Sequence, residues 1–323
     1  MPIRLSDYLK TTYGEKVYRL SLSSGCTCPN RDGSICYDRI NDSYYIGEPA
    51  EGCEPLIGGC TFCSEGGSGE FATKPVDIDT QIELAKKVIQ KKTDARKFIA
   101  YFQSYTNTYD DVDRLRALYH RAISRDDIEI LSIGTRPDCI GEDILGMLIE
   151  LNNIKPVWIE LGLQTIHEET ARRINRGYKL STFEDTYRRL KKAGITVIVH
   201  VILGLPGETK EDMLETVKYL ADLSPALDGI KLQNLQILKG TRMYEELAPG
   251  NNHIPVYHSM SMEEYTDLVA ECIALLPENC VVHRMTGDGP RKLLVDPLWS
   301  LDKKRVLNML TKKTAKYFDE SVK

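Results

Sequence analysis

The sequence lacks three features that would place it in a specialised class of protein. Basic residues are not in excess, since 42 Lys and Arg stand against 47 Asp and Glu, for a net charge of -5. Nucleic-acid binding through phosphates alone usually needs a basic field, so this charge argues against it. No apolar run approaches the roughly 18 residues of a membrane span, and residues 1–7 contain no secretion signal. We therefore expect a cytoplasmic protein with no membrane partner.

Internal repeats of fixed period and low-complexity tracts are also missing, which excludes solenoids and bulk disorder. The composition, with 42% hydrophobic and 28% charged residues, is that of an ordinary globular protein with a sizeable core. A chain of 323 residues exceeds the usual domain size, but α/β barrels hold this many in one unit. We expect one large catalytic domain.

From about residue 98 to residue 238, short apolar runs alternate with amphipathic segments, a pattern typical of βα units and a parallel sheet. The predicted strands are Lys16–Ser23, Lys97–Gln103, Ile128–Gly134, Pro156–Gln164, Thr196–Leu203 and Gly229–Leu238. The predicted helices are Asp79–Lys91, Asp111–Ser124, Gly141–Asn152, Thr182–Ala193 and Lys210–Leu223, with a short one at His167–Ile174. Six consecutive units predict an α/β fold, a partial (β/α)6 barrel that resembles an incomplete TIM barrel.

The remaining segments divide the chain into two predicted parts. Residues 1–240 form the barrel, including an irregular loop over residues 24–75 that follows the first strand, where α/β proteins build their sites. Residues 241–323 form an α/β extension packed on the barrel. Its predicted elements are a helix at Ser261–Leu276, a strand at Val281–Arg284 and a basic helix at Asp302–Phe318.

Cysteines gather in the irregular loop. Of nine in the chain, six lie between residues 26 and 63, namely Cys26, Cys28, Cys36, Cys53, Cys60 and Cys63. In a chain without a secretion signal, such clustering favours metal ligation over disulfides. Thiolates suit both zinc and iron–sulfur clusters, so the cysteines alone leave a zinc-stabilised, non-catalytic binding protein and an iron–sulfur enzyme equally open.

The order of several motifs resembles one family across nearly the whole chain. Cys28-Pro-Asn-Arg-Asp-Gly33 and Gly59-Cys60-Thr-Phe-Cys63 are similar to the cluster motif of an uncharacterised bacterial family of radical S-adenosylmethionine (SAM) proteins, related to the radical-SAM subunit of Elongator. Further motifs of the resemblance are Tyr101-Phe-Gln-Ser-Tyr-Thr-Asn-Thr108, Gly134-Thr-Arg-Pro-Asp138, Glu160-Leu-Gly-Leu-Gln164, Ile174-Asn-Arg-Gly177, Ile202-Leu-Gly-Leu-Pro-Gly-Glu208, Leu238-Lys-Gly-Thr241 and His283-Arg-Met-Thr-Gly287.

This resemblance implies a 4Fe-4S cluster held by Cys28, Cys60 and Cys63, with one iron left for SAM. It also implies reductive cleavage of SAM to a 5'-deoxyadenosyl radical, with electrons from a reductase or a ferredoxin-type donor. Kinship with the Elongator subunit makes tRNA or another RNA the candidate substrate. The net charge and the lack of a recognisable acyltransferase domain argue against carrying over that subunit's whole activity.

The chain departs from the family pattern between its first and second motif cysteines. The extra segment, roughly Ser34 to Ile57, contains Cys36 and Cys53, which the family motif does not need. With Cys26 they could form a second metal site, or the segment could be a lid that closes over substrate. Their spacing decides neither, because separated cysteines in a loop fit no single ligand template.

Five residues near the ends of the second and fourth strands are candidate SAM contacts. By the resemblance, Gln103 and Ser104 take the place where the amino group of SAM is bound, although they could equally cap the strand. Glu160 lies in an otherwise apolar strand, so it needs a cationic or hydroxyl partner, for which the ribose or ammonium of SAM is suitable. Gln164 ends that strand, and Arg176 could pair with the SAM carboxylate or be exposed to solvent.

Four further residues belong to the fifth strand, the turn after it and the end of the sixth strand. Gly204 and Gly207 resemble an adenine and ribose contact region, although such turns also only reverse a chain. Leu238 could touch adenine or belong to the core. His200 is polar within an apolar strand, where a hydrogen-bonded core histidine is the common outcome and a catalytic role the alternative.

Overall fold

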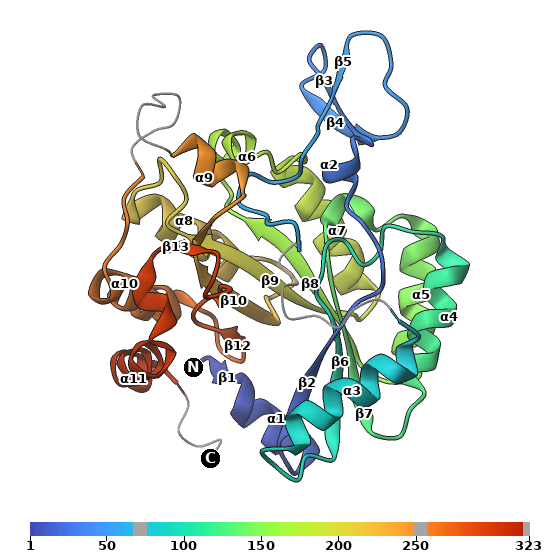
Figure 1. Ribbon diagram of the computed structural model, residues 1–323, viewed down its shortest axis with the longest axis vertical. Coiled ribbons are helices and arrows are strands. Elements are labelled where there is room, and N and C mark those ends of the chain that lie inside the picture. The colour runs from blue at the N-terminus through green and yellow to red at the C-terminus, as the bar shows by residue number, and fades with distance from the viewer. Residues whose placement is uncertain (67–75, 248–256, 319–323) are drawn as a thin grey trace.

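The computed structural model describes residues 1–66, 76–247 and 257–318. Its centre is a parallel sheet of eight strands in the order β1-β12-β10-β9-β8-β7-β6-β2 (Figure 1). Six of these strands follow one another along the chain and confirm the predicted partial (β/α)6 barrel. They are β2 (Val17–Leu22), β6 (Lys97–Phe102), β7 (Ile128–Thr135), β8 (Val157–Gln164), β9 (Thr196–Leu203) and β10 (Gly229–Asn234).

Helices cover the outer face of this sheet, because parallel neighbours need a crossover connection. The crossovers contain α3 (Ile78–Gln90), α4 (Val112–Ile123), α5 (Glu142–Asn152), α6 (Glu168–Arg173), α7 (Leu180–Lys192) and α8 (Lys210–Ala221). Side-chain caps fix several starts: Asp77 accepts from the Thr80 amide, and Thr209 forms a capping box with Asp212. Within the described ranges, no helix has both the length and the apolar character needed to cross a membrane.

The inner face of the barrel is closed at its amino-terminal end by an apolar layer. This layer consists of Leu9, Val17, Ile99, Tyr101, Ile130, Trp158 and Ile198. Leu9 belongs to α1 (Leu5–Tyr13), a helix that the sequence analysis did not predict. Because this end is packed, ligands can reach the barrel interior only from the carboxyl ends of the strands or from the side.

The carboxyl-terminal segment adds to the same sheet. Strand β12 (Val281–Arg284) pairs with β10 on one side and with β1 (Ile3–Arg4) on the other. Helices α10 (Met262–Leu275) and α11 (Lys303–Thr314) pack against each other beside it (Figure 1). The division of the chain at residue 240 stays a prediction.

One predicted strand, Gly229–Leu238, ends earlier than expected. The run from Gly229 to Leu238 splits into β10 and β11 (Ile237–Leu238), and β11 pairs antiparallel with β13 (Leu294–Asp296), before the short helix α9 (Arg242–Glu246). An apolar run does not show where a strand leaves its sheet. The predicted basic helix is also shorter than expected, since α11 ends at Thr314 and a 3-10 turn follows.

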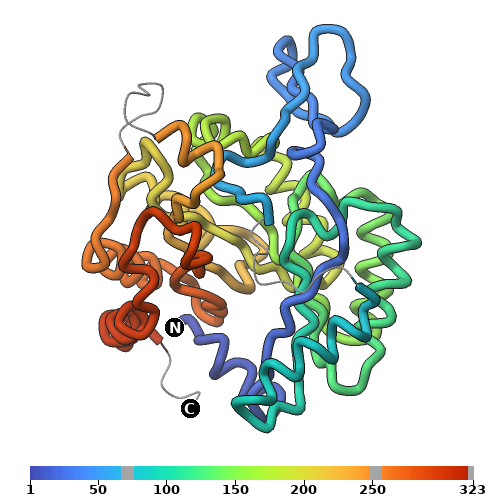
Figure 2. The backbone as a smooth tube through the Cα atoms, viewed as in Figure 1, coloured from blue at the N-terminus to red at the C-terminus, as the bar shows by residue number. Residues whose placement is uncertain are grey.

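The cysteine loop is not irregular throughout, as the sequence analysis expected. The short helix α2 (Pro29–Asp32) follows Cys28, and three strands form an antiparallel sheet that projects from the barrel (Figure 2). These strands are β3 (Ile35–Asp38), β4 (Ser43–Ile46) and β5 (Cys53–Pro55). Strands of three or four residues joined by Asp, Asn and Gly turns are too short to show a period of two.

Candidate active site

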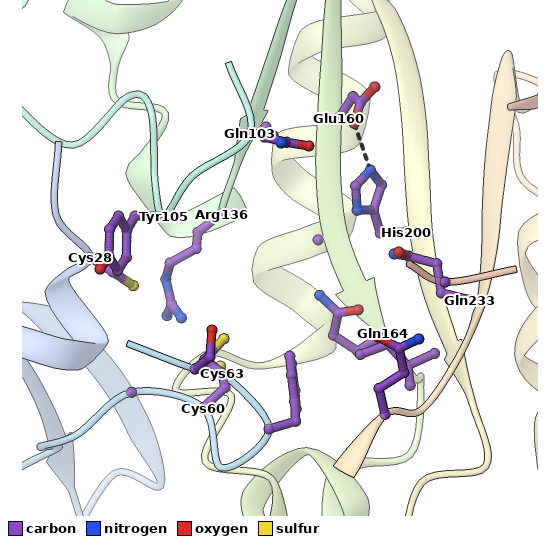
Figure 3. Close-up of a pocket in the computed structure, with 18 of the residues that line it drawn as sticks. Cys28, Cys60, Cys63, Gln103, Tyr105, Arg136, Glu160, Gln164, His200 and Gln233 are labelled. Atoms are coloured by element: carbon purple, nitrogen blue, oxygen red, sulfur yellow. Dashed lines mark hydrogen bonds and ion pairs between the residues drawn. The ribbon is translucent and has the colours of Figure 1, made fainter. Parts of the chain in front are cut away.

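A cavity of about 250 Å³ opens at the carboxyl ends of the barrel strands. The cysteine loop lines one end of it, the ends of β6 to β10 line its middle, and residues that follow β12 complete the wall (Figure 3). Loops after parallel strands converge at this edge of an α/β sheet, which is where such proteins build their sites. We therefore take this cavity as the candidate active site.

Cys28, Cys60 and Cys63 lie together at one end of the cavity (Figure 3). Cys28 directly precedes α2, while Cys60 and Cys63 lie on the loop that returns from the projecting sheet. Gly58 and Gly59 precede Cys60 with φ values of 86° and 81°. Glycine adopts this left-handed conformation at little cost, so the two glycines turn the chain just before the second cysteine. The fold thus joins the two halves of the predicted motif.

Asn30 holds the two cysteine segments together. Its side chain is fully buried, and Nδ2 donates to the Asn175 carbonyl at 2.5 Å and to the Cys60 sulfur at 3.5 Å. The Gly59 amide donates to the Asn30 carbonyl at 2.9 Å, and Asn175 Nδ2 donates to the Gly59 carbonyl at 2.8 Å. The loop that follows α6 therefore fixes the cysteines through Asn30, a contribution that the sequence analysis did not predict.

Arg136 supplies positive charge beside the thiols. The contact with Cys63 and the charge of Arg136 together lower the pKa of Cys60 to about 7, against the effect of burial. Burial raises the pKa of Cys28, and Arg136 opposes that shift. A cation beside a thiol favours the thiolate that ligates metal. Arg136 belongs to one of the family motifs, but the sequence analysis gave it no role.

Cys60 and Cys63 are in contact, but the three thiols do not all lie as close together as the sulfur ligands of a single zinc ion. A tetrahedral zinc ion holds its sulfur ligands about 3.8 Å apart, given Zn–S distances of about 2.3 Å. In the described part of the chain, one group of three ligating side chains has all of its ligand atoms within 4.8 Å of one another. This group is His167, Asp212 and Glu215, on the outer surface. The three cysteines of the cavity do not meet that limit.

The remaining cysteines of the loop lie outside the cavity lining. The buried Cys26 sulfur accepts from Arg114 at 3.3 Å, away from the other thiols. Cys36 and Cys53 lie on neighbouring strands of the projecting sheet. Like the cavity cysteines, these three do not form a group of ligands within 4.8 Å of one another among the described residues, and the second metal site stays a prediction. Part of the predicted loop, residues 67–75, lies outside those ranges.

Five of the eight predicted SAM contacts line the cavity, namely Gln103, Glu160, Gln164, Arg176 and Leu238. Ser104, Gly204 and Gly207 are not in the lining. Gly204 faces the Met260 side chain, its amide contacts the Met213 sulfur at 2.9 Å, and Gly207 is exposed. For these three residues the predicted contact stays a prediction, because the sequence pattern does not fix which side of a turn faces the cavity.

Glu160 forms an ion pair with a buried lysine of the protein itself. Its carboxylate pairs with Lys231, accepts from His200 Nε2 at 2.9 Å and accepts from Ser132 at 3.1 Å. Lys231 also donates to the Tyr101 hydroxyl at 3.0 Å. We call these five residues the inner polar layer, which Tyr101 shares with the apolar layer through its ring, and Figure 3 shows the Glu160–His200 contact.

The charges of the inner polar layer follow from burial and contact. Burial alone would raise the pKa of Glu160, but Lys231 and His200 hold it well below its usual range. Burial and the nearby Lys231 lower the pKa of His200 to about 4, so its imidazole is neutral near pH 7. Lys231 was missed by the sequence analysis, although a lysine in an apolar strand carries the same signal that singled out Glu160.

Arg176 lines the cavity but is fully buried, and its guanidinium donates to backbone carbonyls. It contacts the carbonyls of Leu163 at 3.1 Å, Thr165 at 2.6 Å and Tyr178 at 2.9 Å. In this geometry Arg176 stabilises the loop around Gln164, whose φ of 71° is in the left-handed region. Its predicted pairing with the SAM carboxylate stays a prediction, and solvent exposure, the alternative, is wrong.

Comparison with known proteins gives two matches to families. The profile of the Radical SAM superfamily matches residues 51–220, and that of the Radical_SAM C-terminal domain matches residues 227–316. The chain is 38% identical over 309 residues to the "Uncharacterized protein YtqA" of Bacillus subtilis, covering 95% of this chain and 88% of that protein.

Two further similarities concern the Elongator subunit. "Elongator complex protein 3" of Danio rerio is 30% identical over 166 residues, which are 51% of this chain and 29% of that protein. The solved structure of the archaeal Methanocaldococcus infernus Elp3 superposes with a TM-score of 0.62 at 20% identity, covering 73% of this chain and 59% of that one. At this identity the likeness shows a shared fold.

Proposed function

The chain belongs to the radical SAM superfamily, and from this premise we propose that it cleaves SAM reductively to modify an RNA substrate. Members of this superfamily are enzymes that use a 4Fe-4S cluster and SAM. When bound, the cluster supplies the electron that splits the sulfonium bond of SAM into methionine and a 5'-deoxyadenosyl radical. The protein's own residues position and shield the two cofactors.

The single observation that carries the proposal is the meeting of three thiols at the mouth of one cavity. Cys28, Cys60 and Cys63 would hold three irons and leave the fourth for SAM. Arg136 lies beside them and stabilises their thiolate forms. Three thiolates suit a cluster that leaves one iron open, whereas a closed structural zinc site takes four protein ligands.

Residues that line the middle of the cavity would hold SAM. Gln103 and Gln164 present amides that can both donate and accept, and Leu238 offers an apolar surface for adenine. Glu160 would act through His200, since its own carboxylate is already engaged by Lys231. His200 lines the cavity with its Nδ1 turned away from that contact (Figure 3).

The proposal also names a substrate class and an electron donor. Similarity to Elongator complex protein 3 supports RNA, with tRNA as the first candidate. A ferredoxin-type protein or a reductase would deliver the electron, in the cytoplasm.

The proposal is tested by anaerobic reconstitution with iron and sulfide, followed by SAM, dithionite and fractionated cellular RNA. We expect a brown protein that forms 5'-deoxyadenosine, faster with one RNA fraction. Cys28→Ala, Cys60→Ala and Cys63→Ala should each abolish cleavage, because a cluster iron loses its ligand. Cys26→Ala is the matched control and should keep both iron and activity. A colourless protein with stoichiometric zinc would refute the enzyme, and equal rates with all fractions would refute the RNA substrate.

A further inference from the structure

A side-chain contact closes the side of the barrel where the sheet stays open. Strand β2 is one edge of the sheet, and β12 lies next to the other edge, so their backbones do not pair. Arg19 on β2 nevertheless reaches His283 on β12, with 3.1 Å between Nη2 and Nδ1. The Arg19 guanidinium also lies 5.5 Å from the centre of the Tyr101 ring, and His283 packs edge-on against Trp158. The barrel is therefore closed on this side next to the cavity, since Tyr101 lines the cavity while Arg19 and His283 do not.

The end of the cavity beside this contact, which we call its floor, is lined by Tyr101, Glu160, Gln236, Arg284 and Asp288, and Arg19 and Lys231 contact Tyr101 from outside the lining. Within the described residues, Arg19, Lys231 and Arg284 lie near two carboxylates, Glu160 and Asp288. Glu160 is neutralised by Lys231. Asp288 lies 3.8 Å from Arg284 and also pairs with Lys303.

Arg19 has no counter-charge of its own. Among the residues that the structure describes, no carboxylate lies within 4.0 Å of it. The two histidines add no charge near pH 7, because burial holds the pKa of both below the usual value. Arg19 is only partly buried and does not line the cavity, so its charge adds to the positive field there without direct contact.

The unpartnered polar atoms of this region are donors. Arg19 Nε and Gln236 Nε2 are buried and have no hydrogen-bond partner within the described residues. Gln236 lines the cavity together with Arg284, whose Nη1 makes a long contact of 3.4 Å to Gln233. Of the two, Gln236 lines the cavity, so a ligand that supplies acceptor oxygens there would satisfy its amide.

We propose that the floor of this cavity binds an anionic group of the substrate, a carboxylate or a phosphate, through the Arg284 guanidinium and the Gln236 amide. A guanidinium can grip either group in a bidentate manner. The inference rests on the proposed function, because it places the substrate in the same cavity as SAM. It does not concern the carboxylate of SAM, since Gln233, which Arg284 contacts, lies across the cavity from Arg136 and the cysteines (Figure 3).

The test titrates the reconstituted holoenzyme with inorganic phosphate and, separately, with succinate by calorimetry at constant ionic strength set with chloride. We expect saturable binding of at least one anion, and the anion that binds identifies the class. Arg284→Gln should weaken it at least tenfold, while Arg284→Lys should restore part of the affinity. Arg291→Gln is the matched control, because Arg291 is exposed and outside the cavity lining. Iron content verifies that each variant folds and loads its cluster.

Absence of saturable binding of both anions to the wild type would overturn the inference, as would an equal loss in Arg291→Gln. Formation of 5'-deoxyadenosine is measured in the same preparations. If SAM is cleaved but no anion binds, the inference alone fails. If an anion binds and SAM is not cleaved, the proposed function fails and the anion site stands.

Discussion

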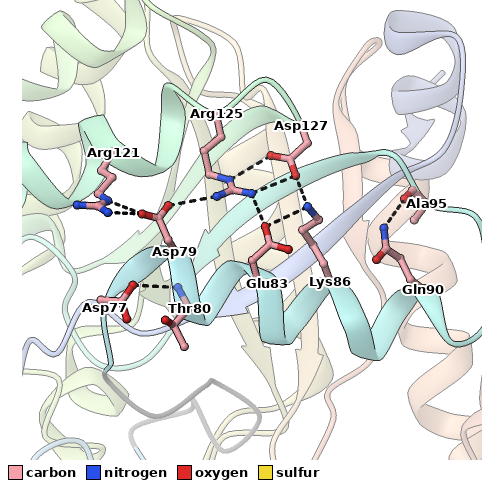
Figure 4. A network of polar contacts seen from close by, with 10 residues as sticks. All are labelled: Asp77, Asp79, Thr80, Glu83, Lys86, Gln90, Ala95, Arg121, Arg125 and Asp127. Atoms are coloured by element: carbon pink, nitrogen blue, oxygen red, sulfur yellow. Dashed lines mark hydrogen bonds and ion pairs between the residues drawn. The ribbon is translucent and has the colours of Figure 1, made fainter.

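Two polar networks of similar composition lie on opposite sides of the same sheet. The central ion pair of the inner polar layer is buried: the side chains of Glu160 and Lys231 are 0% and 1% exposed. The outer network ties α3 to α4 and to the start of β7, with Arg125 contacting Asp79, Glu83 and Asp127 (Figure 4). There the side chains are 24% to 49% exposed.

The difference in exposure indicates that the outer network stabilises the fold and that the inner polar layer serves the site. Exposed ion pairs contribute between about 0 and 1 kcal/mol each, so the outer network adds modestly to helix packing. A buried pair costs several kcal/mol in desolvation, and hydrophobic residues in its place are often equally stable. We infer that the inner pair is kept for its position beside the cavity.

Removal of one buried partner should have the largest effect on stability. Lys231→Met leaves the Glu160 carboxylate buried without its cation, which should lower the free energy of unfolding by about 3–5 kcal/mol. Denaturant unfolding of the cluster-free protein measures this change. A loss below about 1 kcal/mol would show that the inner layer behaves like the outer one.

Acid should destabilise the inner layer through His200. Its pKa is about 4 in the folded protein against about 6.5 in an unfolded chain, so the unfolded state binds more protons between these values. Stability should therefore fall as pH drops from about 6.5 to about 4, by up to about 3 kcal/mol. His200→Gln should remove this slope. His258→Gln, at a 70% exposed histidine, is the control and should leave the slope intact.

Replacement of both buried partners should restore much of the lost stability. In Glu160→Gln/Lys231→Met, neither residue is charged, so the double variant should lose less than half of what Lys231→Met loses alone. The comparison of single and double variants forms a cycle that measures their coupling. Additive losses would mean that the two charges stabilise the fold independently.

The outer network should give the smallest effect. Arg125→Gln should cost about 1 kcal/mol or less, because its three partners stay in contact with water. The cost should shrink further at high salt, which screens exposed pairs. Unfolding at low and high ionic strength tests both points. A large loss of stability that does not depend on salt would show that the outer network behaves like the inner polar layer.

Periodic segments allowed the barrel to be predicted from the sequence. Strand β9 was placed at its observed bounds, and α4 within one residue at each end, because apolar periods and caps are local signals. The three cysteines of the cavity were found because Cys28, Cys60 and Cys63 stand in motifs with fixed neighbours. The projecting sheet was missed, since strands such as β5 have three residues.

Side-chain partners were decided by the tertiary structure. The sequence marked Glu160 as a carboxylate in need of a partner, but Lys231 lies 71 residues further along the chain. The same holds for Arg136 beside the cysteines and for Arg19 across the open side of the barrel. Residue types and local periods determined the fold class and the chemistry of the donors. Only packing determined which charges meet, because a contact between distant strands leaves no trace in the local pattern of either one.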